Sequence, residues 1–260
     1  MTKRSRAIRI GVGGWSFPPW RETFFSAGLA RKNELAYASR QLSAIEINSA
    51  DYRTQKPDTF SKWREETPAD FVFSVKAPRA IVQQRALGVA GESIAWFRDS
   101  GLDRLGEKLG PILWQFAPTK TFDPDDFAAF PRLLPREIGG RVVRHALEAR
   151  HDSFVCSQFV DLARARGAAI VTAVDSPTPQ MDDATADFAY LRIMGTRADE
   201  PLGYRATDFD HWARQAHAIA TRATARDVFL FVIAGAKHKN SLAAQAWRAR
   251  LNARDQTVTA

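Results

Sequence analysis

The sequence predicts an α/β fold, a single (β/α)8 barrel of the TIM type. Eight short runs are rich in apolar or β-branched residues, and most are separated by a segment with helical periodicity. Strands that alternate with helices pair in parallel through right-handed crossovers. Eight such units at about thirty residues each fit a closed barrel, which commonly takes a chain of this size. We therefore expect one domain over residues 1–260, with the barrel proper from about residue 8 to about residue 252.

The predicted strands share a short apolar stretch that ends at a loop. They are Ile8–Gly13, Ala44–Asn48, Phe71–Lys76, Pro111–Phe116, Val142–Arg150, Ala169–Asp175, Phe188–Arg192 and Val228–Ile233.

Helices between these strands are indicated by apolar stripes. The stripes are Leu35 with Ala38 and Leu42, then Phe60 with Trp63, then Ile94, Phe97, Leu102 and Leu105.

Three helix starts can also be predicted. Asp123 before Pro124 is a typical N-cap. Thr207 with Asp210 forms a variant of the capping box, and Ser241 suits the N-cap of the last helix.

One crossover is expected to lack a helix, and one competing fold is disfavoured. Ser176–Asp187 is short and contains Pro177 and Pro179, so we expect a loop or a single turn. An open doubly wound sheet would carry a glycine-rich phosphate loop after its first strand. Gly11–Trp15 lacks that spacing, because Phe17 stands about where the third glycine belongs.

Composition narrows the class of protein. The charged fraction of 25% and hydrophobic fraction of 45% are ordinary for a soluble globular domain, and no apolar run is long enough to span a bilayer. Cys156 is the one cysteine, which excludes an intrachain disulfide. We therefore expect a cytoplasmic protein without a membrane partner; its oligomeric state stays open.

The net charge of +8 raises the alternative of a nucleic-acid partner. Of the 37 basic residues, 28 are arginines scattered along the chain, many in Ala/Arg-rich helical stretches. Such stretches usually form solvated helix faces. Charge alone therefore does not favour nucleic acid over a small molecule.

Charged residues stand where predicted strands meet their loops, and alternation turns them to one side. If Ile45, Ile47, Phe73, Val75, Leu147, Val174 and Leu191 pack outward, the charged residues point into the barrel mouth, where barrel enzymes place their active sites. These residues are Glu46, Lys76, Glu148, Arg150, Asp175 and Arg192. We expect all six to converge on one pocket.

We assign provisional roles within this mouth. The candidate catalytic residues are Glu46, Glu148, Asp175 and Lys76. The candidate ligand-binding residues, which add stacking, amide and cationic groups, are Trp15, Asn48, Tyr52, Gln115, Arg150, Arg192 and Lys237. Ser74 shares the inward phase. Lys237 lies in a basic run before the last helix, where anions often bind in barrels; the alternative is a solvated loop.

Six stretches of the chain form a set of motifs: Gly13–Ser16 with Trp20-Arg21, Glu46–Ser49 with Tyr52-Arg53, Lys76–Arg79, Leu109–Phe116, Glu148–His151 and Asp175–Pro177. Together, in this order, they resemble the YecE-like family, the proteins with domain of unknown function 72. The resemblance runs from about Ile8 to the final helix and implies a TIM-like barrel. It implies no reaction, because the family has no established activity. This chain departs from the family pattern at Gln83, Met194 and Ile233-Ala234, where relatives carry imidazole or amide side chains.

Three interpretations of the mouth follow. In the leading one, it binds or transforms a polar, anionic small molecule such as a sugar or a phosphorylated metabolite. In the second, the three negative and three positive charges form an ion-pair network that only closes the barrel. In the third, Glu46, Glu148, Asp175 and His151 hold a metal, although three nearby cations oppose it. We expect no bound metal and no cofactor.

Overall fold

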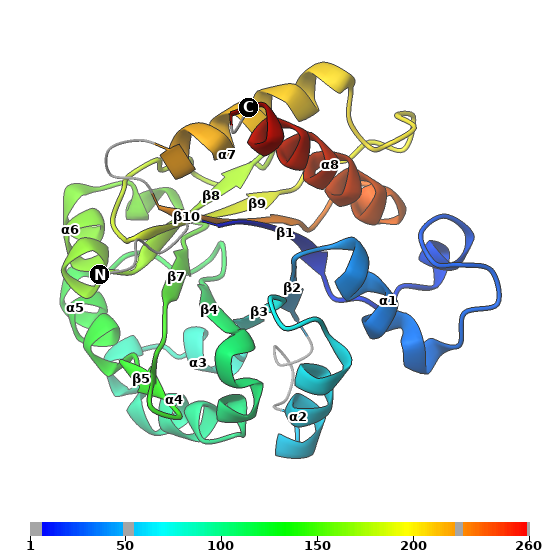
Figure 1. The fold of residues 1–260 in the computed structure, drawn as a ribbon. Helices are drawn as coiled ribbons and strands as arrows, with labels where there is room; N and C mark the ends of the chain where they lie inside the picture. The colour runs from blue at the N-terminus through cyan, green and yellow to red at the C-terminus, as the bar shows by residue number, and fades with distance from the viewer. Residues whose placement is uncertain (1–6, 49–54, 222–225, 259–260) are drawn as a thin grey trace.

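The barrel predicted from the sequence is present. The computed structural model describes residues 7–48, 55–221 and 226–258. Eight parallel strands close a barrel in the order β1-β10-β9-β8-β7-β4-β3-β2, and helices surround it (Figure 1). No helix within these ranges is both long and apolar enough to cross a membrane.

The strand positions agree closely with those expected, with one exception. The barrel strands are β1 (Ile8–Gly13), β2 (Ala44–Ile47), β3 (Val72–Lys76), β4 (Leu109–Gln115), β7 (His145–Glu148), β8 (Ala169–Val174), β9 (Phe188–Ile193) and β10 (Asp227–Val232). The prediction of one strand over Val142–Arg150 is wrong at its start. Arg141–Val142 (β6) instead pairs antiparallel with Glu137–Ile138 (β5), outside the barrel. Gly139 and Gly140 have positive φ angles and make the turn between these two short strands.

The barrel wall separates two apolar layers, as alternation requires. The outward side chains, among them Ile45, Val75 and Leu191, join the large cluster beneath the helices. A smaller cluster fills the barrel interior with Ala44, Leu113, Ala146, Ala169, Val171, Phe188, Tyr190, Phe229 and Phe231. Residues two positions further along these strands therefore point inward at the carboxyl end of the barrel.

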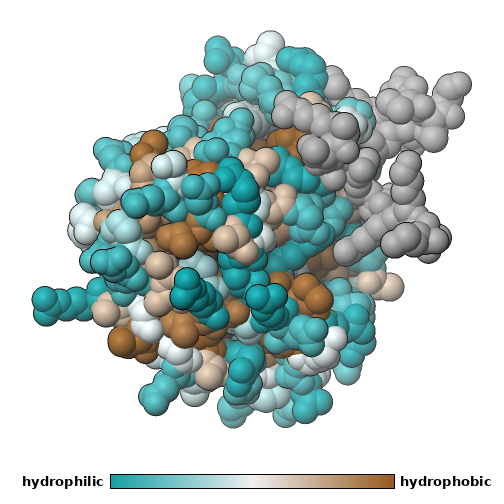
Figure 2. All heavy atoms as spheres, turned by 90° about the vertical axis from the view of Figure 1, so that its left-hand side faces the viewer, coloured by the Kyte–Doolittle hydropathy of each residue, from teal (hydrophilic) through white to brown (hydrophobic). Residues whose placement is uncertain are grey.

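The helices follow the strands in most units. They are α1 (Glu34–Gln41), α2 (Pro57–Glu66), α3 (Arg79–Val82), α4 (Gly91–Arg98), α5 (Pro124–Leu133), α6 (Ser157–Arg166), α7 (Ala206–Thr221) and α8 (Asn240–Val258). The crossover from β8 to β9 contains no helix, as its prolines predicted. The face that carries α5 and α6 is largely hydrophilic, with apolar side chains in small separate patches (Figure 2).

Two of the three predicted helix starts are misplaced. The prediction for Asp123 is confirmed, because its side chain accepts hydrogen bonds from the backbone N–H groups of Asp125 and Asp126. Thr207 instead lies inside α7, where Asp208 accepts a hydrogen bond of 3.2 Å from the N–H of Arg205. Ser241 also lies inside its helix. A 3-10 turn over Lys237–Lys239 runs directly into α8 and displaces the predicted cap.

Replacing Asp123 with Ala is expected to cost about 1 kcal/mol of stability, because two N–H groups of the first turn lose their acceptor. Urea denaturation of Asp123→Ala measures the loss. The matched control is Thr121→Ala, an exposed residue just outside the helix. Equal stability of the two variants would show that the cap contributes nothing.

Candidate functional site

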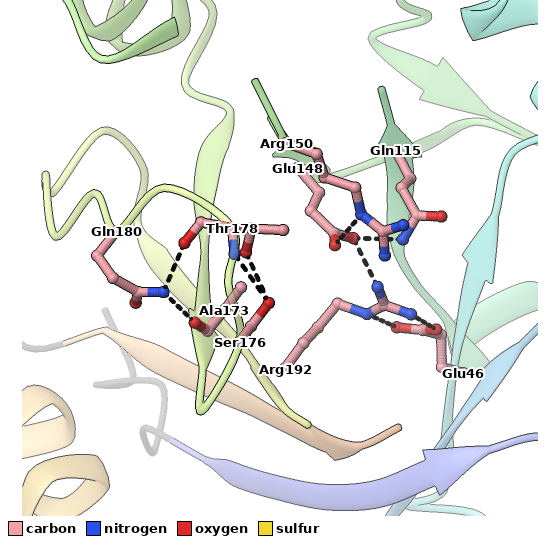
Figure 3. A network of polar contacts seen from close by, with 9 residues as sticks. All are labelled: Glu46, Gln115, Glu148, Arg150, Ala173, Ser176, Thr178, Gln180 and Arg192. Carbon is pink, nitrogen blue, oxygen red and sulfur yellow. Dashed lines mark hydrogen bonds and ion pairs between the residues drawn. The ribbon is translucent and has the colours of Figure 1, made fainter. Parts of the chain in front are cut away.

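An ion-pair cluster closes the interior of the barrel near its carboxyl end. Arg192 on β9 holds both carboxylates of Glu46 and Glu148. Its Nη2 and Nε lie 2.9 and 3.2 Å from the two oxygens of Glu46, and its Nη1 lies 2.6 Å from Oε2 of Glu148. All three side chains are 3% exposed or less. Arg192 therefore spans the barrel and uses each of its nitrogens on a protein carboxylate (Figure 3).

The inward positions of β1 are occupied by glycines. In the circular strand order, β10 and β1 lie between β9 and β2. The register places Gly11 beside Ala44 and Gly13 beside Glu46, so the inward positions of β1 carry no side chain. A Cβ atom on Gly11 would lie only 2.0 Å from the carbonyl oxygen of Ala44. At this point β1 approaches β2 too closely for any side chain at position 11.

Tyr190 and Ser74 extend the hydrogen bonds of the cluster into the barrel interior. The Tyr190 hydroxyl donates to Oε2 of Glu46 at 2.7 Å, and it lies 2.8 Å from Oγ of Ser74. Burial, with the negative charge of Glu46 as the next cause, holds the pKa of Tyr190 well above its usual range. Tyr190 is therefore a neutral donor. Tyr190 was not among the residues predicted from the sequence, although it precedes Arg192 by two residues and so shares its inward phase.

Gln115 and Arg150 complete the cluster on the solvent side. Nε2 of Gln115 lies 2.7 Å from Oε2 of Glu148, and Nε of Arg150 lies 3.0 Å from Oε1. Burial alone would raise the pKa of Glu148, but the charges of Arg192 and Arg150 and these hydrogen bonds outweigh it and lower the pKa. Glu148 is therefore ionised. The side chain of Arg150 is 26% exposed, so the cluster meets solvent there.

The other residues predicted for the mouth do not share one position. Lys76 and Asn48 are half-buried at the carboxyl ends of β3 and β2, and the amide of Asn48 donates to the carbonyl oxygen of Glu46 at 3.4 Å. Lys237 is exposed on its 3-10 turn, with Nζ 4.5 Å from the centre of the Phe17 ring. Tyr52 lies outside the described residues.

Two of the predictions for the mouth are corrected. Trp15 packs against the outer layer, where the centre of its ring lies 4.8 Å from that of Trp63 and 6.5 Å from that of Phe73. Asp175 is exposed, and within the described residues no hydrogen bond or ion pair joins it to the Arg192 cluster; it lies beside Tyr204 instead. In both places a positive φ angle ends the strand's alternation, 72° at Gly14 before Trp15 and 52° at Asp175 itself.

Of the six predicted charges, the structure joins Glu46, Glu148, Arg150 and Arg192 by hydrogen-bonded ion pairs. Glu148 is a poor proton donor, because the charges of Arg192 and Arg150 lower its pKa. His151 lies outside this cluster, since its Nδ1 accepts from the N–H of Ser153 at 3.2 Å. Within the described ranges, no group of three or more His, Cys, Asp and Glu side chains is placed to hold a metal ion.

The residues that depart from the resembled pattern bring no acid or base to the mouth. Ile233 packs against the inner apolar cluster, and Met194 is half-buried just after β9. Gln83 ends α3, where its N–H bonds to the carbonyl oxygen of Arg79.

Comparison with known proteins agrees with this architecture. The family model described as "Protein of unknown function DUF72" matches residues 9–260. The UPF0759 protein YecE of Escherichia coli strain K12 is 31% identical over 150 residues, which cover 56% of this chain and 50% of that protein. The chain thus matches about half the length of this curated relative.

Two solved structures share the fold. A DUF72 family protein from Thermotoga maritima has a TM-score of 0.74 at 18% identity, covering 95% of this chain and 99% of that one. A DUF72 family protein from Enterococcus faecalis V583 also has a TM-score of 0.74 at 18% identity, covering 94% and 95%.

Proposed function

Because the chain belongs to the DUF72 family of unknown function, we propose a function from its own barrel mouth: it binds a small polar molecule that carries a phosphate or carboxylate group. The observation that carries this proposal is the state of Arg150. Its Nε bonds to Glu148 at 3.0 Å, and the two terminal nitrogens form no hydrogen bond with any residue in the described ranges. A partly exposed guanidinium with unused donors is a ready contact for an anion.

The buried cluster gives Arg150 a fixed orientation. Glu148 accepts from Arg192, Gln115 and Arg150 together, so its carboxylate cannot rotate without breaking several hydrogen bonds. Groups that are held by hydrogen bonds in this way lose less entropy when they bind a ligand. Arg192 therefore positions Glu148, and Glu148 positions Arg150.

The charges near the mouth determine which kind of ligand fits. Glu46 and Glu148 neutralise Arg192 and Arg150, so the hydrogen-bonded cluster itself has no net charge. Lys76, half-buried on β3, adds one positive charge at the same end of the barrel. Affinity then depends on the fork of Arg150. The amides of Asn48 and Gln115 supply donors for the rest of a polar ligand.

Replacing Arg150 with Ala is expected to weaken binding of ribose 5-phosphate, inorganic phosphate or sulfate by about ten- to a hundredfold, as for a lost charged hydrogen bond. Arg150→Lys should recover only part of the affinity, because an ammonium group cannot make the two parallel bonds of a guanidinium. Calorimetric titration measures both effects.

The matched control for this titration is Arg164→Ala, which removes an arginine from the exposed face of α6, where it pairs with Asp161. That variant should bind each anion as the parent does. If no anion produces binding heat with the parent, or if Arg150→Ala binds them unchanged, the mouth is a structural ion-pair network and the proposal is wrong.

A further inference from the structure

A second polar cavity lies at the rim, apart from the Arg192 cluster. It measures about 490 Å³ and is lined by Asp175, Gly195, Arg197, Tyr204, Arg205, Asp208, His211 and Trp212. The segments that meet here are the end of β8, the connection from β9 to α7, and the first turns of α7. A cavity of this size is in the range that holds small molecules.

Asp175 is held at this cavity by its backbone and by Tyr204. Its φ angle of 52° is in the left-handed region, which is strained for a residue with a side chain. A Cβ atom on Gly195 would lie 2.5 Å from the Cβ of Asp175, so the two chain segments touch where Gly195 has no side chain. The Tyr204 hydroxyl accepts from the N–H of Gly195 at 2.8 Å and lies beside the carboxylate of Asp175.

The charges of the cavity leave Asp175 as its unpaired ion. Arg197 and Arg205 both contact Oδ2 of Asp208, at 3.0 and 3.4 Å, and Arg197 also pairs with Glu200 at 3.6 Å. Among the described residues, no Lys, Arg or His forms an ion pair with Asp175. Burial, and then the charge of Asp175, raises the pKa of Tyr204 above its usual range, so Tyr204 stays neutral. The carboxylate of Asp175 is thus available to a cation.

An apolar wall extends from this cavity. His211 and Trp212 of α7 line it and also line a second cavity of about 370 Å³, which lies over the outward face of β8 and β9. The second cavity includes Ile170, Leu191 and Ile219. It lies in the unit that has no crossover helix. Trp212 is half-buried, and Trp rings are the aromatic groups that attract cations most strongly.

We propose that these two adjoining cavities bind an organic amine, with its ammonium group against Asp175 and its apolar body along Trp212 and Ile219. Asp182 and Asp183 also line the second cavity, so its two carboxylates outnumber its one guanidinium, that of Arg226. An anion near Asp175 would instead meet that carboxylate, while Arg197 and Arg205 already contact Asp208. This site is separate from the anion site of the mouth and does not depend on it.

The test compares ligands that share a ring but differ in charge. Calorimetric titration with 2-phenylethylamine, 2-phenylethanol and 3-phenylpropanoate at pH 7 should show saturable binding of the amine, at least about tenfold tighter than of the other two. Asp175→Asn should remove most of that preference, because Asn tolerates the left-handed backbone but carries no charge. Trp212→Leu should weaken the phenyl amine and leave ethanolamine, which has no ring, unchanged.

Two controls separate this site from others. Asp58→Asn removes an exposed carboxylate on α2, away from both cavities, and should bind the amine as the parent does. Arg150→Ala should also bind the amine normally; a loss there would place the amine in the mouth and overturn the proposal. The proposal is also overturned if the parent binds no amine, if it prefers the propanoate, or if Asp175→Asn keeps the full preference for the amine.

Discussion

Replacing Arg192 with Met is expected to lower the free energy of unfolding by about 3–5 kcal/mol, which is the usual loss when one partner of a buried ion pair is removed. Arg192 contributes three hydrogen bonds to two carboxylates that are themselves 1% exposed or less. Without it, Glu46 and Glu148 would be like charges inside an apolar barrel. For a domain of this size, the melting temperature should fall by about 6–20 °C.

Further variants, which change the carboxylates as well, isolate the effect of the unpaired charges. Glu46→Gln with Glu148→Gln in the Arg192→Met background leaves no buried ion, so much of the lost stability should return. Arg192→Lys keeps the positive charge but cannot bond both carboxylates through a fork, so its stability should be intermediate. Chemical denaturation of the four proteins measures the series. If Arg192→Met is as stable as the parent, the cluster does not contribute as a buried ion pair.

Strand alternation explains how much of this cluster the sequence could reveal. Glu46, Glu148 and Arg192 each follow an inward apolar residue by two positions, and regular strands carry that phase through to the mouth. The same alternation places Tyr190 inward, but this residue was overlooked because its neighbours along the strand are apolar. The inward phase of the strands is therefore sufficient to predict the residues of the buried cluster.

Alternation failed where the strands end. Asp175 is one residue beyond β8 and Trp15 is two beyond β1, and a positive φ angle redirects the chain at each place. Glycine can signal such a turn, as Gly14 does, but an aspartate gives no comparable signal. Loop residues depend on contacts with distant segments, such as the contact of Asp175 with Gly195, and local patterns do not encode these contacts.

The outward position of His145 on its strand determines the burial and the protonation state of its ring. It precedes Ala146, an inward residue, so it points outward beneath the helices, where it is 1% exposed. The indole Nε1 of Trp114 donates to its Nδ1 at 3.0 Å, and its Nε2 lies 2.7 Å from the carbonyl oxygen of Pro135. Because indole can only donate and a carbonyl can only accept, the ring is neutral with its proton on Nε2.

This arrangement predicts a loss of stability in weak acid. Burial is the main cause that lowers the pKa of His145 from 6.5 to about 4, and the charge of Arg166 acts in the same direction. The unfolded chain takes up this proton near pH 6.5, whereas the folded protein resists until about pH 4. The contribution of His145 is therefore complete above pH 6.5 and is lost as the pH falls toward 4, by about 3 kcal/mol in all.

Urea denaturation of the parent and of His145→Asn between pH 7 and pH 4 measures this contribution. The Asn side chain can still accept from Trp114, and it does not titrate, so the variant should be less stable at pH 7 but should lose about 3 kcal/mol less on acidification. Other titrating groups act equally in both proteins and cancel in the comparison. If the two stability curves ran parallel over this range, His145 would take up its proton in the folded protein as easily as in the unfolded chain. That outcome would contradict the prediction, because the Trp114 N–H directed at Nδ1 opposes protonation of that nitrogen.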